Sequence, residues 1–123
     1  MIKGSCLCGD VGFETAAEPS GASMCHCTQC RKQSGGIWAS AQVRDVDLMI
    51  TGPVRWFEAT SLAKRGICPR CGSFLFWKAM DEDTISFALG AVDGNTGLSV
   101  EKHIFTASKG DYYDIADGVP QED

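Results

Sequence analysis

Short stretches of the chain alternate between hydrophobic and polar residues, and this period of two residues is typical of half-buried β-strands. Residues 11–15 and 84–89 show it best. In the second stretch Ile85, Phe87 and Leu89 would share one face. Similar patterns predict further extended segments at residues 22–27, 37–43, 45–51, 54–59 and 101–106.

A second local signal predicts one short helix. Thr28 is a suitable N-cap, residues 29–33 would form the helix, and Gly35 and Gly36 would end it. A continuous apolar run at residues 73–78 predicts a strand that is buried on both faces. With no repeat and no linker, the pattern indicates a mainly β, single domain over residues 1–123.

Composition and charge exclude some classes of binding partner for such a domain. The 123 residues carry a formal net charge of −5, with acidic residues concentrated near the C-terminus. Phosphate binding needs a basic face, so we expect no nucleic-acid partner. No apolar run approaches membrane-spanning length, and the first residues lack the features of a secretory signal. We therefore expect a cytoplasmic protein without membrane contact.

The seven cysteines change the picture most, because they fall into groups of two, three and two at metal-binding spacings. In both outer groups, Cys-x-Cys and Cys-x-x-Cys, a glycine follows directly. Such a glycine lets the backbone turn tightly and aim amide hydrogens at the sulfurs. We therefore group four cysteines as a structural zinc site: Cys6, Cys8, Cys68 and Cys71.

The middle group holds Cys25, Cys27 and Cys30, and no further cysteine is left to complete a second four-thiolate site. Three protein ligands with a vacant fourth position are usual for a catalytic zinc, which holds water or substrate there. Cys30 would lie in the first turn of the helix, where the helix dipole favours a thiolate. The sequence thus predicts two zinc ions per chain.

Residues beside the middle group are candidates for substrate contacts. In an extended segment His26 points away from its two cysteine neighbours, so we interpret it as a supporting or surface group rather than a ligand. Arg31 and Lys32 could meet substrate carboxylates such as those of glutathione, although a solvated helix face also explains each of them. His26 or His103 could transfer a proton.

Two other interpretations of the cysteines stay open. The middle group could share a ligand with one of the flanking pairs. Alternatively, the thiols could form disulfides, against which the odd cysteine count, the lack of a signal peptide and the metal-type spacings all argue.

The chain resembles the glutathione-dependent formaldehyde-activating (GFA) enzyme family, also called the CENP-V/GFA domain family. The resemblance runs over nearly the whole chain and rests on these segments: Gly4-Ser5-Cys6-Leu7-Cys8-Gly9, Cys25-His26-Cys27, Cys30-Arg31-Lys32, Cys68-Pro69-Arg70-Cys71-Gly72, Gly90-Ala91-Val92-Asp93, His103-Ile104 and Asp117-Gly118-Val119-Pro120. The chain departs from the family in two ways. It looks shorter than the formaldehyde-activating members, and it has Tyr112-Tyr113 where a tryptophan is frequent.

The resemblance implies an Mss4-like fold of folded-over antiparallel β-sheets with one short helix, stapled by zinc. It implies the same division into a structural and a catalytic zinc that the spacings indicate. The implied activity is that of a carbon–sulfur lyase, which forms or breaks S-(hydroxymethyl)glutathione from glutathione and formaldehyde. A small-molecule thiol such as glutathione would then be the partner.

Two other functions compete with the lyase. A non-catalytic, zinc-stabilised protein-binding module would have no need of a vacant ligand position at the middle zinc, so that position distinguishes the two. A redox or metal-storage protein would lose metal and form a disulfide among the middle cysteines on mild oxidation.

Overall fold

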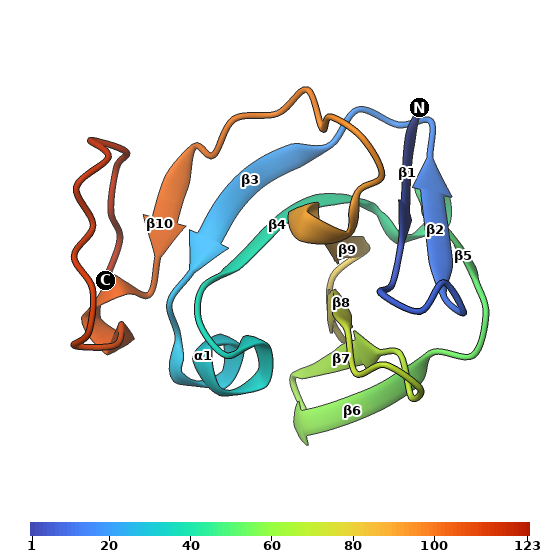
Figure 1. The fold of residues 1–123 in the computed structure, drawn as a ribbon, viewed down its shortest axis with the longest axis horizontal. Coiled ribbons are helices and arrows are strands. Elements are labelled where there is room, and N and C mark those ends of the chain that lie inside the picture. The colour runs from blue at the N-terminus through green and yellow to red at the C-terminus, as the bar shows by residue number, and fades with distance from the viewer.

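The computed structural model describes residues 1–123 and contains ten β-strands and one α-helix (Figure 1). The strands are β1 (Ile2–Ser5), β2 (Gly12–Thr15), β3 (Ser20–Cys25), β4 (Trp38–Arg44), β5 (Met49–Thr51), β6 (Arg55–Thr60), β7 (Ala63–Ile67), β8 (Phe74–Ala79), β9 (Thr84–Ala88) and β10 (Lys102–Ile104). The helices are α1 (Thr28–Ser34) and three 3-10 turns, η1 (Asp45–Asp47), η2 (Leu89–Ala91) and η3 (Thr106–Ser108). The predicted mainly β fold with one short helix is confirmed. None of the helices is long and apolar enough to cross a bilayer.

The strands form two sheets. A three-stranded antiparallel sheet has the order β1-β2-β5 and lies at the right of Figure 1. The larger sheet has seven strands in the order β10-β3-β4-β9-β8-β7-β6, and only the β10–β3 pair is parallel. Helix α1 leads directly from β3 towards β4 and also receives hydrogen bonds from β7. The larger sheet thus contacts α1 through β3, which precedes the helix, and through β7, which donates hydrogen bonds to it.

The main core is an aromatic cluster that joins the two sheets. Phe13 on β2 packs edge-on against Phe76 on β8, with ring centroids 5.5 Å apart, and lies 5.4 Å from the Phe87 ring on β9. Phe76 and Phe87 have no exposed surface. Full burial of each such side chain contributes about 1.5–3 kcal/mol. This cluster fixes the small sheet against the large one, and with it the turn after β1.

One glycine lets the cluster extend to the sheet edge. Gly66 on β7 has no side chain between Phe76 and Trp56, whose rings lie 6.1 Å apart. A Cβ atom at Gly66 would lie 2.8 Å from Cδ2 of Phe76 and 3.1 Å from Cζ3 of Trp56. Such distances are too short for unstrained contact, so the packing requires glycine here.

Some local predictions were wrong. The N-cap of α1 is Cys27 rather than Thr28, because the Cys27 sulfur accepts a hydrogen bond from the Cys30 amide at 3.3 Å. The residue that caps the helix is thus itself one of the three middle cysteines. Residues 45–51 do not form one strand, since η1 interrupts the alternation and leaves Val46 78% exposed.

The extended segment predicted at residues 54–59 forms β6 at the edge of the large sheet. Every residue of this edge strand is at the surface, and Phe57 is 52% exposed. Strands β1 and β7 were not predicted. The β7 segment Ala63–Ile67 contains two cations and a glycine, and its hydrophobic pattern is therefore weak.

Candidate metal centres

The four cysteines of the outer pairs meet between the turn after β1 and the turn after β7: Cys6, Cys8, Cys68 and Cys71. The two turns are built alike. The Gly9 amide donates to the Cys6 carbonyl at 3.1 Å, and the Gly72 amide donates to the Cys68 carbonyl at 2.9 Å. Both glycines have a positive φ, 85° and 79°, as a tight turn after each pair requires.

The sulfur spacing of this four-cysteine site suits one tetrahedral metal ion. All four thiols are free, and their Sγ atoms lie within 4.8 Å of one another. The Cys8 sulfur is 3.6 Å from that of Cys6 and 3.7 Å from that of Cys68. A Zn–S distance of about 2.3 Å places the corners of a tetrahedron about 3.8 Å apart. The site could therefore hold a metal ion with four sulfur ligands.

Neighbouring polar groups favour thiolates at this site. The Val11 amide donates to the Cys6 sulfur at 3.3 Å. The Ser73 hydroxyl lies 3.2 Å from the Cys71 sulfur, and this hydrogen bond, helped by the Ser73 amide, lowers the pKa of Cys71 to about 5. Hydrogen bonds of this kind orient sulfur ligands and stabilise their negative charge.

The three middle cysteines also meet, at the junction of β3 and α1. Cys25 ends β3, Cys27 caps α1, and Cys30 lies in the first turn of that helix. Their Sγ atoms lie within 4.8 Å of one another, and no fourth histidine, cysteine or carboxylate belongs to the group. Cys25 and Cys30 are buried, whereas Cys27 is half-buried. This three-cysteine site could hold a metal ion with one position free of protein ligands.

The thiols of this site differ in acidity. The hydrogen bond between Cys25 and Cys30, together with the Arg65 guanidinium, lowers the pKa of Cys30 to about 6. The same hydrogen bond and burial raise the pKa of Cys25. Cys30 is thus the first of the two to become a thiolate, which is the form that binds metal.

Arg65 is a site residue that the sequence analysis missed. It is 5% exposed, and its Nη1 atom donates to the Cys30 sulfur at 3.6 Å. Nη1 also donates to the Gln33 side-chain oxygen at 3.2 Å, and Nη2 donates to that of Gln29 at 2.9 Å. The guanidinium carbon lies 5.4 Å from the centre of the Phe74 ring. Arg65 is 35 residues from Cys30, so no local motif could have revealed it.

The two cations predicted to contact substrate lie on α1 but differ in exposure. Arg31 is half-buried, and its Nε atom is buried without a hydrogen-bond partner. Its positive charge opposes the rise in the pKa of Tyr113 that burial causes. Lys32 is exposed. Their contact with a substrate stays a prediction.

His26 is fully buried and belongs to a hydrogen-bonded chain that crosses the C-terminal segment. Its Nδ1 pairs with the Tyr113 hydroxyl, and its Nε2 lies 2.8 Å from Nδ1 of His103 on β10. His103 Nε2 in turn lies 2.8 Å from the Asp117 carboxylate. Burial, with the nearby His103, lowers the pKa of His26. Its role in substrate binding stays a prediction, with both ring nitrogens already paired.

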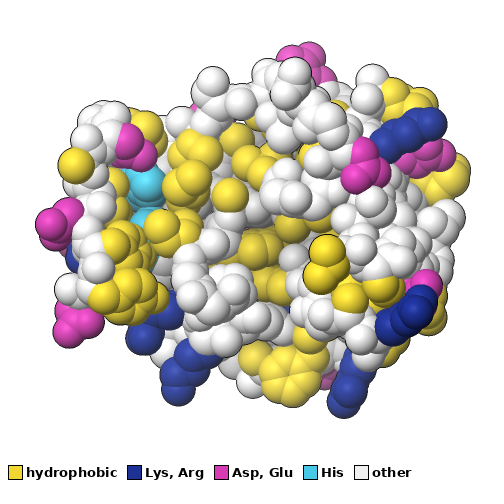
Figure 2. Space-filling view, viewed as in Figure 1, with side chains coloured by type: hydrophobic (Ala, Val, Ile, Leu, Met, Phe, Trp, Pro, Cys, Tyr) yellow, Lys and Arg dark blue, Asp and Glu magenta, His cyan; other side chains and the backbone are white.

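With both histidines neutral, the chain of four groups has one consistent set of proton positions. An ionised Asp117 accepts the Nε2 proton of His103, so His103 Nδ1 accepts the Nε2 proton of His26. His26 Nδ1 then accepts the hydroxyl proton of Tyr113. Every ring nitrogen of the two histidines then has a hydrogen-bond partner. In Figure 2 the histidine side chains lie between the C-terminal segment and the rest of the molecule.

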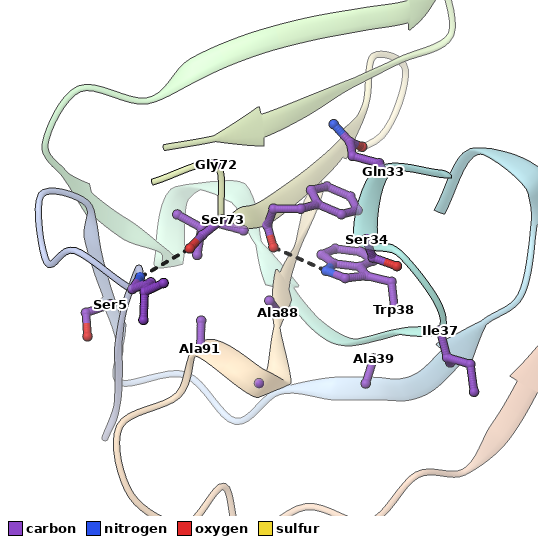
Figure 3. Close-up of a pocket in the computed structure, with 14 residues that line it drawn as sticks. Ser5, Gln33, Ser34, Ile37, Trp38, Ala39, Gly72, Ser73, Ala88 and Ala91 are labelled. Atoms are coloured by element: carbon purple, nitrogen blue, oxygen red, sulfur yellow. Dashed lines mark hydrogen bonds between the residues drawn. The ribbon is translucent and has the colours of Figure 1, made fainter. Parts of the chain in front are cut away.

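A cleft of about 520 Å³ lies between the end of α1 and the turns after β1 and β7, and none of its lining residues is a cysteine (Figure 3). Ser73 lines it next to the four-cysteine site, and Gln33 lines it from the end of α1. Its aromatic wall is Trp38, which stacks on Phe74 at a centroid distance of 4.1 Å and donates to the Phe74 carbonyl at 3.3 Å. Trp38, Phe74 and Ala88 also pack around Cys25 and Cys30. The cleft and the three-cysteine site thus share a wall.

No charged side chain lines this cleft. On the face drawn in Figure 2, apolar side chains gather across the middle while lysine, arginine, aspartate and glutamate lie towards its edge. Clefts of a few hundred Å³ with apolar walls and a few polar groups are typical ligand sites.

Comparisons with known proteins agree with this arrangement. A search of curated protein sequences finds no significant match. A crystal structure of a Rhodobacter sphaeroides protein matches with a TM-score of 0.61 and 25% sequence identity, over 77% of this chain and 91% of that one. The family model described as "Glutathione-dependent formaldehyde-activating enzyme" matches residues 1–108. The resemblance of the cysteine motifs is thereby confirmed, and the chain belongs to the glutathione-dependent formaldehyde-activating enzyme family.

Proposed function

We propose that the protein is a zinc-dependent carbon–sulfur lyase that acts on thiol adducts, with S-(hydroxymethyl)glutathione as the leading candidate. The observation that carries the proposal is the contrast between the two cysteine sites. One offers four sulfur ligands, and the other offers three, which leaves one coordination position for water or substrate. In this proposal the four-cysteine site is structural and the three-cysteine site is catalytic.

Both sites suit zinc. Their ligands would all be thiolates, which soft or borderline cations prefer, and at the four-cysteine site the sulfur separations match a tetrahedron of zinc dimensions. At the three-cysteine site a bound zinc would supply Lewis acidity, which lowers the pKa of a thiol or polarises a carbonyl group. Cys25, Cys27 and Cys30 would hold it.

The burial of the three cysteines determines the side from which a thiol can approach the site. Cys25 and Cys30 are buried behind Trp38 and Phe74, whereas Cys27 is half-buried, so a thiol would approach from the Cys27 side. The Cys30 amide and the Arg65 guanidinium donate hydrogen bonds to sulfurs and hold them in place. The stacked rings exclude water from one side of the site.

The position of the substrate's charged groups follows from the charge of the surroundings. Glutathione carries carboxylates, and the cleft walls offer them no cation. Arg31 and Lys32 on α1 are the cations closest to the cysteine site in sequence, and we assign the carboxylates to them.

A non-catalytic zinc-binding module is the second candidate. The exposed aromatic Phe57 and the fully exposed edge strand β6 favour it, because unpaired edge strands bind other chains. The lyase needs a metal position at the three-cysteine site where a ligand can exchange, whereas the binding module does not. Ligand exchange at that site therefore distinguishes the two functions.

The first test combines metal content with exchange kinetics. The purified protein is loaded with zinc and mixed with glutathione and formaldehyde. Exchange NMR then measures the rate at which free glutathione and its hydroxymethyl adduct interconvert. We expect two zinc ions per chain and an exchange rate above the uncatalysed one. Cys27→Ser should keep the zinc of the four-cysteine site and lose the acceleration. Thr28→Ala, with an exposed neighbouring side chain, is the matched control.

A separate readout does not depend on turnover. Cobalt replaces zinc, and glutathione is titrated against the visible spectrum of the cobalt protein. A saturable shift that Cys27→Ser abolishes supports the open site. Two bound cobalt ions with no spectral shift would refute the glutathione assignment, and a single bound ion would refute the two-site arrangement.

A further inference from the structure

Arg65 is a buried cation with no carboxylate partner. It is 5% exposed, and its guanidinium donates only to two glutamine oxygens and to the Cys30 sulfur. An unpaired buried cation strongly destabilises a fold, so a fold retains one where an anion faces it. The only group facing Arg65 that can carry a negative charge is the three-cysteine site.

The two cysteine sites would also differ in net charge when each holds a divalent cation. A divalent cation held by three thiolates leaves one net negative charge, and Arg65 brings the total to zero. The four-cysteine site, with the same cation, would carry two negative charges. The arginine nearest to it in sequence, Arg70, is at the surface and pairs with Asp10 at 3.3 Å. Only the site with three protein ligands therefore has a buried cation against its sulfur.

We propose that Arg65 is a positioning residue that compensates the charge of the three-cysteine site and makes the site select an anionic fourth ligand, a thiolate, over a neutral one. Without Arg65, a fourth thiolate would bring the site to two negative charges in a buried position. With Arg65 the total is one. The inference rests on the proposed function only in taking the thiol substrate as the ligand that is selected.

The link from Arg65 to the cleft passes through Gln33. The Gln33 side chain lines the cleft and accepts a hydrogen bond from the same Nη1 atom that donates to Cys30. Gln29 fixes the other nitrogen, and Phe74 covers the guanidinium face. These contacts hold the positive charge against the sulfur and not in solvent, where screening would weaken it.

The test measures ligand binding to the cobalt-loaded protein, with thiocyanate as the anionic probe and imidazole as the neutral one. Arg65→Met removes the charge, and Arg65→Lys keeps it. For a charge about 6 Å from the ligand at an effective dielectric constant of about 20, we expect Arg65→Met to weaken thiocyanate binding by about 10- to 100-fold. Imidazole binding should change less than about threefold. Arg65→Lys keeps the charge but loses the forked hydrogen bonds, so its thiocyanate affinity should lie between those of the wild type and Arg65→Met.

A second variant avoids removing a buried side chain. Gln33→Glu is nearly isosteric and gives Arg65 a carboxylate partner 3.2 Å away, which neutralises its charge in place. It should also weaken thiocyanate binding more than imidazole binding. Gln42→Glu is the matched control, four residues along β4 from Trp38 and therefore about 13 Å away along the strand. It should leave both affinities unchanged.

The wild-type protein supplies a measurement that needs no variant. Titration calorimetry with 2-mercaptoethanol, in buffers of different ionisation enthalpy, should show about one proton released per thiol bound. Binding without proton release would overturn the proposal, as would equal losses for both probes in Arg65→Met and in Gln33→Glu. Intact thiocyanate selectivity in a protein that does not accelerate adduct exchange would refute the proposed lyase function and leave the role of Arg65 standing.

Discussion

Removing the Tyr113 hydroxyl tests whether the hydrogen-bonded chain holds the C-terminal segment in place. Tyr113→Phe takes away one oxygen atom and leaves the ring stacked on His26, at a centroid distance of 5.6 Å. His26 Nδ1 then lies in a fully buried side chain with no donor. An unsatisfied buried polar atom costs about 1–3 kcal/mol.

The expected change in melting temperature follows from the size of the protein. At about 2.1 cal/mol/K per residue, 123 residues unfold with an entropy of about 0.26 kcal/mol/K. One kcal/mol then lowers Tm by about 4 °C, so Tyr113→Phe should lower it by about 4–12 °C. The assay is thermal unfolding of the zinc-loaded protein, followed by circular dichroism.

Hydrogen exchange locates the loss. The His103 amide donates to the Pro120 carbonyl and the Glu122 amide to the His103 carbonyl, both at 2.8 Å. If the segment loosens rather than the whole fold, these two amides should exchange faster in Tyr113→Phe. Tyr112→Phe is the control, because the neighbouring ring is 65% exposed. Equal Tm values and equal exchange rates in the two variants would refute the role we give to the chain.

Three further predictions concern stability, pH and metal content. Gly66→Ala should destabilise the fold by about 1–3 kcal/mol, because its Cβ would press on Phe76, whereas Gly36→Ala meets no atom within 4 Å and should be nearly neutral in denaturant unfolding. The hydrogen bond from His103 lowers the pKa of Asp117 below its ordinary 3.8, so its charge stabilises the fold above that pH. The Tm difference between wild type and Asp117→Asn should persist from pH 7 to 5 and shrink below 3.8; a difference that already shrinks at pH 6 would contradict the assignment. Cys8→Ser should lower thermal stability far more than Cys27→Ser, as metal analysis and Tm together would show, since only the four-cysteine site joins the turns after β1 and β7.

The grouping of the cysteines could be predicted because it depends on short-range geometry. Thiols two or three residues apart in a tight turn can reach one metal ion whatever surrounds them, and the glycines after Cys8 and Cys71 mark such turns. The alternation around His26 likewise predicted that its side chain points away from the neighbouring cysteines. Hydrophobic alternation predicted β2 and β9, and a continuous apolar run predicted β8, nearly within their limits.

The rest was decided by contacts between distant segments. Sequence alone gave no sign that β7 exists, because its hydrogen bonds to β6 and β8 and not its own hydrophobicity make it a strand. The register of those strands brings Arg65 to Cys30, and the return of the chain after β10 brings Tyr113 and Asp117 to the two histidines. The charge at the three-cysteine site and the partners of His26 therefore come from the tertiary structure, since both depend on residues at least 35 positions away.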